Sequence, residues 1–147
     1  MIMTPKKLVL ILLTASWVMV GSFSTAVAGE NPIVKKDNPT ESISKKNLKK
    51  MLLGKAKKWK NGDKVVLATL GGGDTHEKFI KAFAGKTAKQ FTNYWRKMVF
   101  SGKGKMPKSF DSEEDLAAFV ADNKGALGYT AAGVVFDGTR VTNLQNW

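Results

Sequence analysis

Met51-Leu52-Leu53-Gly54-Lys55, with Trp59 close behind, is the first of three phrases that decide the fold of this 147-residue chain. The second phrase begins at Tyr94-Trp95-Arg96 and continues into a loop rich in glycine and lysine, residues 101–107. The third phrase is Gly125-Ala126-Leu127-Gly128-Tyr129. Aromatic residues in such settings are more often core than binding surface, so we interpret those of the three phrases as packing residues.

In this order and at these separations, the three phrases resemble the phosphate-transporter type of periplasmic solute-binding domain, within the type 2 periplasmic-binding-protein superfamily. The resemblance extends from about Pro32 to Leu144 and is to the short, single-lobe form of the domain. It implies an α/β fold equivalent to one half of a full-size relative, with a small mixed sheet flanked by about four helices. It also implies a binding protein and not an enzyme, because the larger relatives hand their solute to an ATP-driven membrane permease.

Residues 1–28 have the pattern of a secretory signal peptide. Lys6 and Lys7 precede the apolar run Leu8 to Val20, and Ala26-Val27-Ala28 supplies the small residues of a cleavage site. The run is 13 residues long, whereas about 18 to 20 are needed to cross a bilayer, which disfavours an uncleaved anchor. We therefore expect export to the periplasm with cleavage after Ala28, and one periplasmic-binding-protein-like domain over residues 29–147.

The exported domain is strongly basic. Removal of Lys6 and Lys7 with the leader lowers the formal net charge from +12 to +10, because no acidic residue precedes Glu30. A net positive charge of this size favours anionic partners such as oxyanions, lipid headgroups or acidic polymers. The alternative is that the charge only keeps the protein soluble. Nucleic acid is not expected as a partner, since the chain is predicted to be exported and has no nucleic-acid-binding motif. The chain has no cysteine, so its stability depends on an apolar core and not on disulfides.

The rest of the sequence alternates strand and helix patterns, which indicates α/β layers around one sheet. Ser44 and Ser112 stand where helix N-caps are expected, and Gly54 stands where the first helix should end. The predicted helices run from about Ser44 to Gly54, from the glycine run through Phe83, from Thr87 to Phe100 and from Ser112 through Val120. The third of these helices has a broad apolar stripe that we expect to face the core, formed by Phe91, Tyr94, Trp95, Met98 and Val99. The predicted strands are 32–34, 64–69, 126–129, 134–136 and 140–144, the last two joined by a turn at Asp137-Gly138.

The strongest chemical candidate is the loop Gly71-Gly72-Gly73-Asp74-Thr75, between a predicted strand and a predicted helix. Backbone amides that carry no side-chain bulk can converge on an oxyanion there, and the helix N-terminus adds attraction. In phosphate-binding relatives this turn carries an Arg followed by Ser-Gly-Thr. By that resemblance Thr75 matches the Thr, whereas Leu70, Gly73 and Asp74 replace the Arg, Ser and Gly. The alternative is a structural turn that uses glycine for its backbone angles.

Ser101 and Lys103 form a second candidate site, offering a hydroxyl and an amine near a helix end, although an exposed loop lysine is the simpler interpretation. Full-size relatives close two lobes around their ligand, whereas residues 29–147 suffice for only one. Two hypotheses follow from this. Either the lobe binds phosphate or another small oxyanion with an ABC-type permease, a second copy or another protein beside it, or it is a periplasmic interaction module that contacts a protein, an envelope polymer or the membrane.

An enzyme is not expected. His76 is the only histidine, and without cysteine the chain cannot build a multi-histidine or thiolate metal site. Asp74, His76 and Glu77 are neighbours in sequence, but residues one or two apart on a helix point in different directions. We expect no catalytic residue, no metal and no cofactor.

Overall fold

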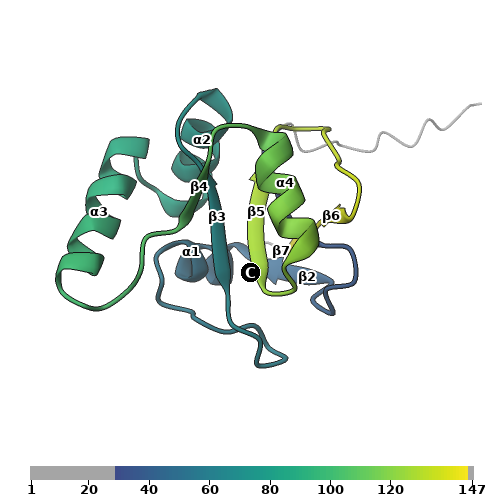
Figure 1. The fold of residues 1–147 in the computed structure, drawn as a ribbon, viewed down its shortest axis with the longest axis horizontal. Helices are drawn as coiled ribbons and strands as arrows, with labels where there is room; N and C mark the ends of the chain where they lie inside the picture. The colour runs from purple at the N-terminus through teal and green to yellow at the C-terminus, as the bar shows by residue number, and fades with distance from the viewer. Residues whose placement is uncertain (1–28, 146–147) are drawn as a thin grey trace, which may run out of the picture.

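The computed structural model describes residues 29–145, which form one mixed α/β layer structure (Figure 1). The main sheet has five strands in the order β4-β3-β5-β1-β6, and a separate two-stranded sheet pairs β2 with β7. The strands are β1 (Asn31–Lys35), β2 (Ser42–Ser44), β3 (Val66–Leu70), β4 (Lys108–Phe110), β5 (Ala126–Thr130), β6 (Thr139–Val141) and β7 (Asn143–Gln145). β4, β3 and β5 run parallel, whereas β1 is antiparallel to both of its neighbours.

Four α-helices surround the sheet, as the sequence predicted. They are α1 (Lys45–Leu52), α2 (Asp74–Phe79), α3 (Ala88–Phe100) and α4 (Glu113–Asp122), and a π-helical turn, η1 (Ile80–Ala84), continues α2. In Figure 1, α4 lies across β5, and α3 stands to one side of the sheet, beyond β4. None of the helices in the described part of the chain is long and apolar enough to span a membrane.

Local hydrogen bonds set the helix starts. The hydroxyls of Ser44 and Ser112 accept from the backbone N–H of Asn47 and Asp115, which confirms both predicted N-caps. Thr87 makes a capping box with Gln90, each side chain accepting from the other's backbone N–H. These bonds satisfy amides that have no partner inside the helix.

Alternation along β5 places helices on both faces of the sheet, because successive side chains of a strand point in opposite directions. Gly128 faces α4 so closely that an added Cβ would lie 2.5 Å from Leu116 Cδ2. Tyr129 faces the other way, and its ring stacks on Phe79 of the α2–η1 segment with centroids 4.1 Å apart. The glycine therefore lets α4 approach the sheet, while its neighbour fills the opposite side of the core.

The three sequence phrases meet in the folded chain. The indole N–H of Trp95 donates to the Leu52 carbonyl at 3.1 Å, and the Tyr94 hydroxyl donates to the Leu53 carbonyl at 2.6 Å. The indole N–H of Trp59 donates to the Gly125 carbonyl at 3.0 Å. Trp59 and Trp95 are both buried, which confirms that they are packing residues.

Several sequence predictions were wrong in detail. Residues 134–136 are not a strand, because turn hydrogen bonds at Val134 and Phe136 replace strand pairing and Val135 is 65% exposed. β6 and β7 are not a hairpin about Asp137-Gly138, since β6 pairs with β1 and β7 pairs in parallel with β2. Val99 does not belong to a buried stripe on α3 and is 41% exposed.

Close backbone packing at Gly125 gives the first prediction. A Cβ at this position would lie 2.0 Å from the Lys64 carbonyl oxygen, a backbone atom that cannot rotate away. Gly125→Ala should therefore lower the free energy of unfolding in urea by about 3 kcal/mol, the upper end of overpacking costs. Gly72→Ala is the matched control, because nothing lies within 4 Å of its Cβ position. Equal effects of the two substitutions would contradict this packing.

Candidate ligand-binding site

The glycine loop lies where the parallel strands end. Gly71 follows β3 and donates its N–H to the Phe110 carbonyl of β4 at 2.9 Å. Gly73 has a φ of 94°, in the region that favours glycine, and it precedes α2 without any side-chain cap. Gly72 and Gly73 have no atom within 4 Å of an ideal Cβ position. The loop therefore exposes backbone that no side chain caps. Its two ends are held in place, one by the sheet and the other by α2.

Asp74, the carboxylate of the glycine loop, is ion-paired. Its carboxylate lies 2.6 Å from the ammonium of Lys78, one helical turn away. The hydrogen bond that the Lys78 ammonium donates to Asp74, together with the negative charge of Asp74, raises the pKa of Lys78 above its ordinary value. Both side chains are exposed, so the pair adds little to stability. The pair places the Lys78 ammonium beside the loop, where it offsets the charge of Asp74.

Beneath the loop, His76 and Tyr129 form a buried polar pair that sequence analysis did not predict. The Tyr129 hydroxyl accepts from the Leu70 N–H at 2.8 Å and lies 2.5 Å from His76 Nδ1. Burial raises the pKa of Tyr129 far above its ordinary range, so the hydroxyl keeps its proton. Burial also lowers the pKa of His76, an effect that the charge of Glu77 opposes. The hydroxyl therefore donates to Nδ1, and the neutral imidazole carries its hydrogen on Nε2.

A cavity of about 170 Å³ lies behind the loop, lined in part by Gly71, His76 and Ser109. Thr69 and Thr92 also line it, but their hydroxyls donate to the carbonyls of Lys108 and Ala88. The hydrogen-bond donors that can face this cavity are thus His76 Nε2 and the Ser109 hydroxyl. The cavity is neutral and small, and the charged groups of the loop lie outside it.

Acidic side chains gather at this end of the molecule. Half of the 12 acidic residues of the chain lie on α2, on the segment after β4 or on the first turn of α4. They are Asp74, Glu77, Asp111, Glu113, Glu114 and Asp115. Glu113 accepts from the Ala131 N–H at 3.2 Å, beside the end of β5. The electrostatic potential at the carboxyl ends of the strands is therefore less favourable to anions than the net positive charge of the whole chain implies.

Ser101 and Lys103 lie away from the glycine loop. The α3–β4 connection that holds them is at the lower end of Figure 1, whereas α2 is at the upper end. The Ser101 hydroxyl donates to the Met98 carbonyl at 3.2 Å. Lys103 lines a different hollow, a groove of about 560 Å³ between α3 and the start of β3. Lys103 therefore lies in this groove and not at the glycine loop, although the groove and the cavity behind the loop share Trp95, Met106 and Pro107 in their walls.

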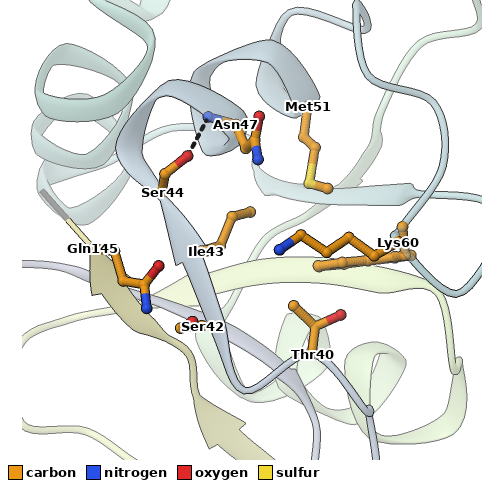
Figure 2. A pocket seen from close by; sticks show the side chains of 9 residues that line it. Thr40, Ser42, Ile43, Ser44, Asn47, Met51, Lys60 and Gln145 are labelled. Carbon is orange, nitrogen blue, oxygen red and sulfur yellow. Dashed lines mark hydrogen bonds between the residues drawn. The ribbon is translucent and has the colours of Figure 1, made fainter. Parts of the chain in front are cut away.

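A further hollow of about 330 Å³ lies between α1 and the small β2–β7 sheet (Figure 2). Figure 2 shows the Lys60 side chain extending across it toward Ile43, with Thr40 below. Ser44 lines the hollow, but its hydroxyl is already engaged as the cap of α1. Sequence analysis missed this hollow, because Ser44 and Gln145, which both line it, become neighbours only through the parallel pairing of two three-residue strands.

Comparisons with solved structures show that this fold matches a part of several phosphate-binding or phosphate-transport proteins. A phosphate ABC transporter substrate-binding protein from Clostridium perfringens, solved with bound phosphate, superposes with a TM-score of 0.61 at 20% identity, over 79% of this chain and 44% of its own. An ABC-type phosphate transport receptor from Vibrio cholerae superposes with a TM-score of 0.59 at 14% identity, over 79% and 46%. A possible phosphate-binding protein from Planctomyces limnophilus gives 0.57 at 14% identity, over 80% and 42%.

These likenesses confirm the predicted fold and the single-lobe resemblance. The chain spans less than half the length of the solved proteins that it matches. The matching proteins are binding proteins and receptors by description, not enzymes. No protein-family model matches the sequence, and a search of curated proteins finds no match.

The buried His76 gives a pH prediction. Its pKa lies below 6.5 in the folded chain, so the unfolded chain takes up a proton at pH values where the folded chain does not. Stability rises with pH wherever the unfolded state binds more protons. The free energy of unfolding should therefore fall as the pH is lowered from about 7 through the ordinary histidine pKa toward the folded pKa.

Urea titrations of the wild type and of His76→Gln at several pH values measure this dependence. Acidic residues contribute equally to both proteins, so the difference between the two curves isolates the imidazole, which is the only one in the chain. An NMR titration that places the folded His76 pKa at or above 6.5 would contradict its burial as described.

Proposed function

We propose that this chain is a secreted periplasmic solute-binding lobe that binds phosphate or another small oxyanion at the glycine loop, in association with an ABC-type transporter. The observation that carries the proposal is the uncapped start of α2 after Gly71-Gly72-Gly73, at the carboxyl end of a parallel strand. Exposed amides at such a position bind oxyanions through hydrogen bonds and the partial charge of the helix. The fold likeness to phosphate-binding proteins supports this placement.

Three groups would contact the anion. The backbone amides of the loop supply donors, the Thr75 hydroxyl supplies another, and Lys78 supplies positive charge beside Asp74. Leu70 supplies nothing at the position where the family has an Arg. A single lobe covers only one side of the anion, and small-molecule sites that are tight bury most of their ligand. We therefore infer weak binding by the lobe alone, strengthened when a second copy or a partner protein covers the open side.

The charge distribution favours a second candidate function. Acidic residues lie around the glycine loop, whereas the segment from Lys78 to Lys108 contains basic residues and no acidic one. A protein whose positive surface lies away from its small-ligand site is suited to bind a large anionic partner there. The alternative is thus a periplasmic interaction or accessory module that uses the lobe to contact a protein, an envelope polymer or the membrane.

Thermal unfolding with phosphate, sulfate or chloride at matched ionic strength tests the oxyanion site. A ligand that binds only the folded state stabilises it, and at tenfold excess over Kd this amounts to about 1.4 kcal/mol, roughly 5 °C in Tm. The expected result is a saturable rise specific to phosphate that is lost in Thr75→Ala and kept in Lys103→Gln. The same shift with all three salts would overturn oxyanion binding by the lobe and leave the interaction module.

Export gives a separate prediction. The full chain expressed with its own leader should be recovered from the periplasmic fraction with the intact mass of residues 29–147. Mass spectrometry of the fractionated protein measures this. Recovery of the uncleaved chain from the membrane or the cytoplasm would contradict the predicted signal peptide.

A further inference from the structure

The end of α3 and the connection to β4 expose apolar side chains to solvent. Phe100 is 97% exposed, Met106 is 50% exposed and Val99 is 41% exposed. Among the described residues, Val135 is the one other large hydrophobic that is exposed to this degree. Together with Arg96 and Lys97, the three side chains line a shallow hollow of about 450 Å³. Contiguous exposed apolar groups with a polar rim are typical of interaction surfaces.

The fold holds this surface in a defined conformation. On the opposite side of α3, Phe91 and Trp95 are buried in the core, so Phe100 at the last position of the helix is directed outward. The chain then turns at Gly102, whose φ is 69°. The N–H groups of Gly102 and Lys103 donate to the carbonyls of Val99 and Met98, which ties the connection to the helix end. The surface is thus preorganised and needs little ordering to bind.

Positive charge surrounds the apolar side chains. Between Glu77 and Asp111 the sequence has no acidic residue. The basic residues of this segment are Lys78, Lys81, Lys86, Lys89, Arg96, Lys97, Lys103, Lys105 and Lys108. Arg96, Lys97, Lys103 and Lys105 are exposed beside Phe100 and Met106. The three ion pairs in the described part of the chain use Lys35, Lys78 and Lys124, so these four cations are not neutralised by an ion pair.

A lysine-rimmed groove adjoins the same surface. Met106 lines both the shallow hollow at Phe100 and the groove of about 560 Å³ that contains Lys103. Val65, Leu67 and Pro107 give the groove apolar walls, and Lys57, Lys58 and Lys64 extend the positive rim. Apolar and cationic groups therefore continue from the end of α3 toward the start of β3.

We propose that this surface, which we call the basic apolar tip (residues 96–106), docks the protein on a bilayer that contains anionic phospholipid. Phe100, Val99 and Met106 would enter the boundary between headgroups and acyl chains, and Arg96, Lys97, Lys103 and Lys105 would contact the phosphates. Amphipathic elements with an apolar side and Lys or Arg around it bind membranes in this way. Figure 1 shows α3 and the loop that follows it at one edge of the molecule.

A bilayer suits the geometry better than an acidic protein partner. The Phe100 side chain is 97% exposed at the end of α3. The four cationic side chains lie around it on an exposed surface and do not outline a pocket for one particular acidic group. A fluid lipid surface accommodates such a projection, whereas a protein partner needs a matching pocket. The proposal does not use the glycine loop, and it holds whether or not that loop binds phosphate.

Vesicle co-sedimentation tests the tip, using the processed chain recovered from the periplasmic fraction. Vesicles of equal parts phosphatidylglycerol and phosphatidylcholine should bind the protein, pure phosphatidylcholine vesicles should bind it weakly, and added salt should reverse binding. Phe100→Ser should weaken the vesicle affinity about tenfold, and the double variant Lys103→Gln/Lys105→Gln should weaken it about fivefold or more.

Matched controls separate the tip from general charge and general hydrophobicity. Val135→Ser removes an apolar side chain that is 65% exposed elsewhere, and Lys45→Gln/Lys46→Gln removes the same charge from exposed positions on α1. Both should keep the wild-type vesicle affinity within about twofold. The Tm of each variant reports its folding, and the phosphate response of Phe100→Ser should equal that of the wild type.

Three results would overturn the proposal. They are equal binding to neutral and anionic vesicles, equal losses in the tip and control variants, and binding to monomeric lysophosphatidylglycerol without binding to vesicles. Failure of all vesicle binding, with retention on an acidic protein column that Phe100→Ser abolishes, would assign the tip to a protein partner instead.

Discussion

The two buried indoles hold the domain together, because each ties a distant segment to the backbone of another. Trp95 of α3 donates to Leu52 at the end of α1, and Trp59 donates to Gly125 at the start of β5. Carbonyls buried at such junctions lose water and need a protein donor. The glycines beside the indoles let the segments approach: Gly54 has Trp95 Cη2 2.6 Å from its Cβ position, and Gly125 lies against Lys64. The end of α1, the segment around Trp59 and the start of β5 are thereby fixed in place in the domain.

Tyr129 extends this arrangement to the candidate site. Its ring stacks on Phe79 and its hydroxyl joins the Leu70 amide to His76. The end of β3 and the start of α2 are therefore both held by a residue of β5. The glycine loop between them is open at its tip and fixed at both ends, which suits a backbone-donor site. The basic apolar tip lies at the end of α3, the helix that Trp95 anchors, and its Met106 also lines the cavity behind the glycine loop.

Local chemistry in the sequence predicted the parts of the fold that depend on local hydrogen bonds. The hydroxyls of Ser44 and Ser112 cap their helices by accepting a hydrogen bond from the backbone N–H three residues later in the chain. Both partners of such a bond can be identified in the sequence. The parallel pairing of β2 with β7 was not predictable, because two exposed or half-buried strands of three residues carry too little pattern. Val134-Val135-Phe136 has strand composition, yet tertiary context gives it turns.

The candidate site was likewise predictable from the sequence only in part. The position of the glycine loop between strand and helix was predictable from its composition. The contact of His76 with Tyr129 was not, because 53 residues separate them and only the sheet order brings them together. The grouping of Phe100 and Met106 with four cations also required the fold, since the sequence pattern of α3 placed Val99 in the core.

The central claim is that the two ends of the lobe have different anionic partners, a small oxyanion at the glycine loop and a lipid surface at the basic apolar tip. Backbone amide NMR of the labelled protein tests it directly, with phosphate added in one titration and phosphatidylglycerol-containing bicelles in another. The account predicts that phosphate shifts amides of residues 71–76 and that bicelles shift or broaden those of residues 96–106. Phosphate and bicelles that perturb the same residues, or perturb neither segment, would contradict it.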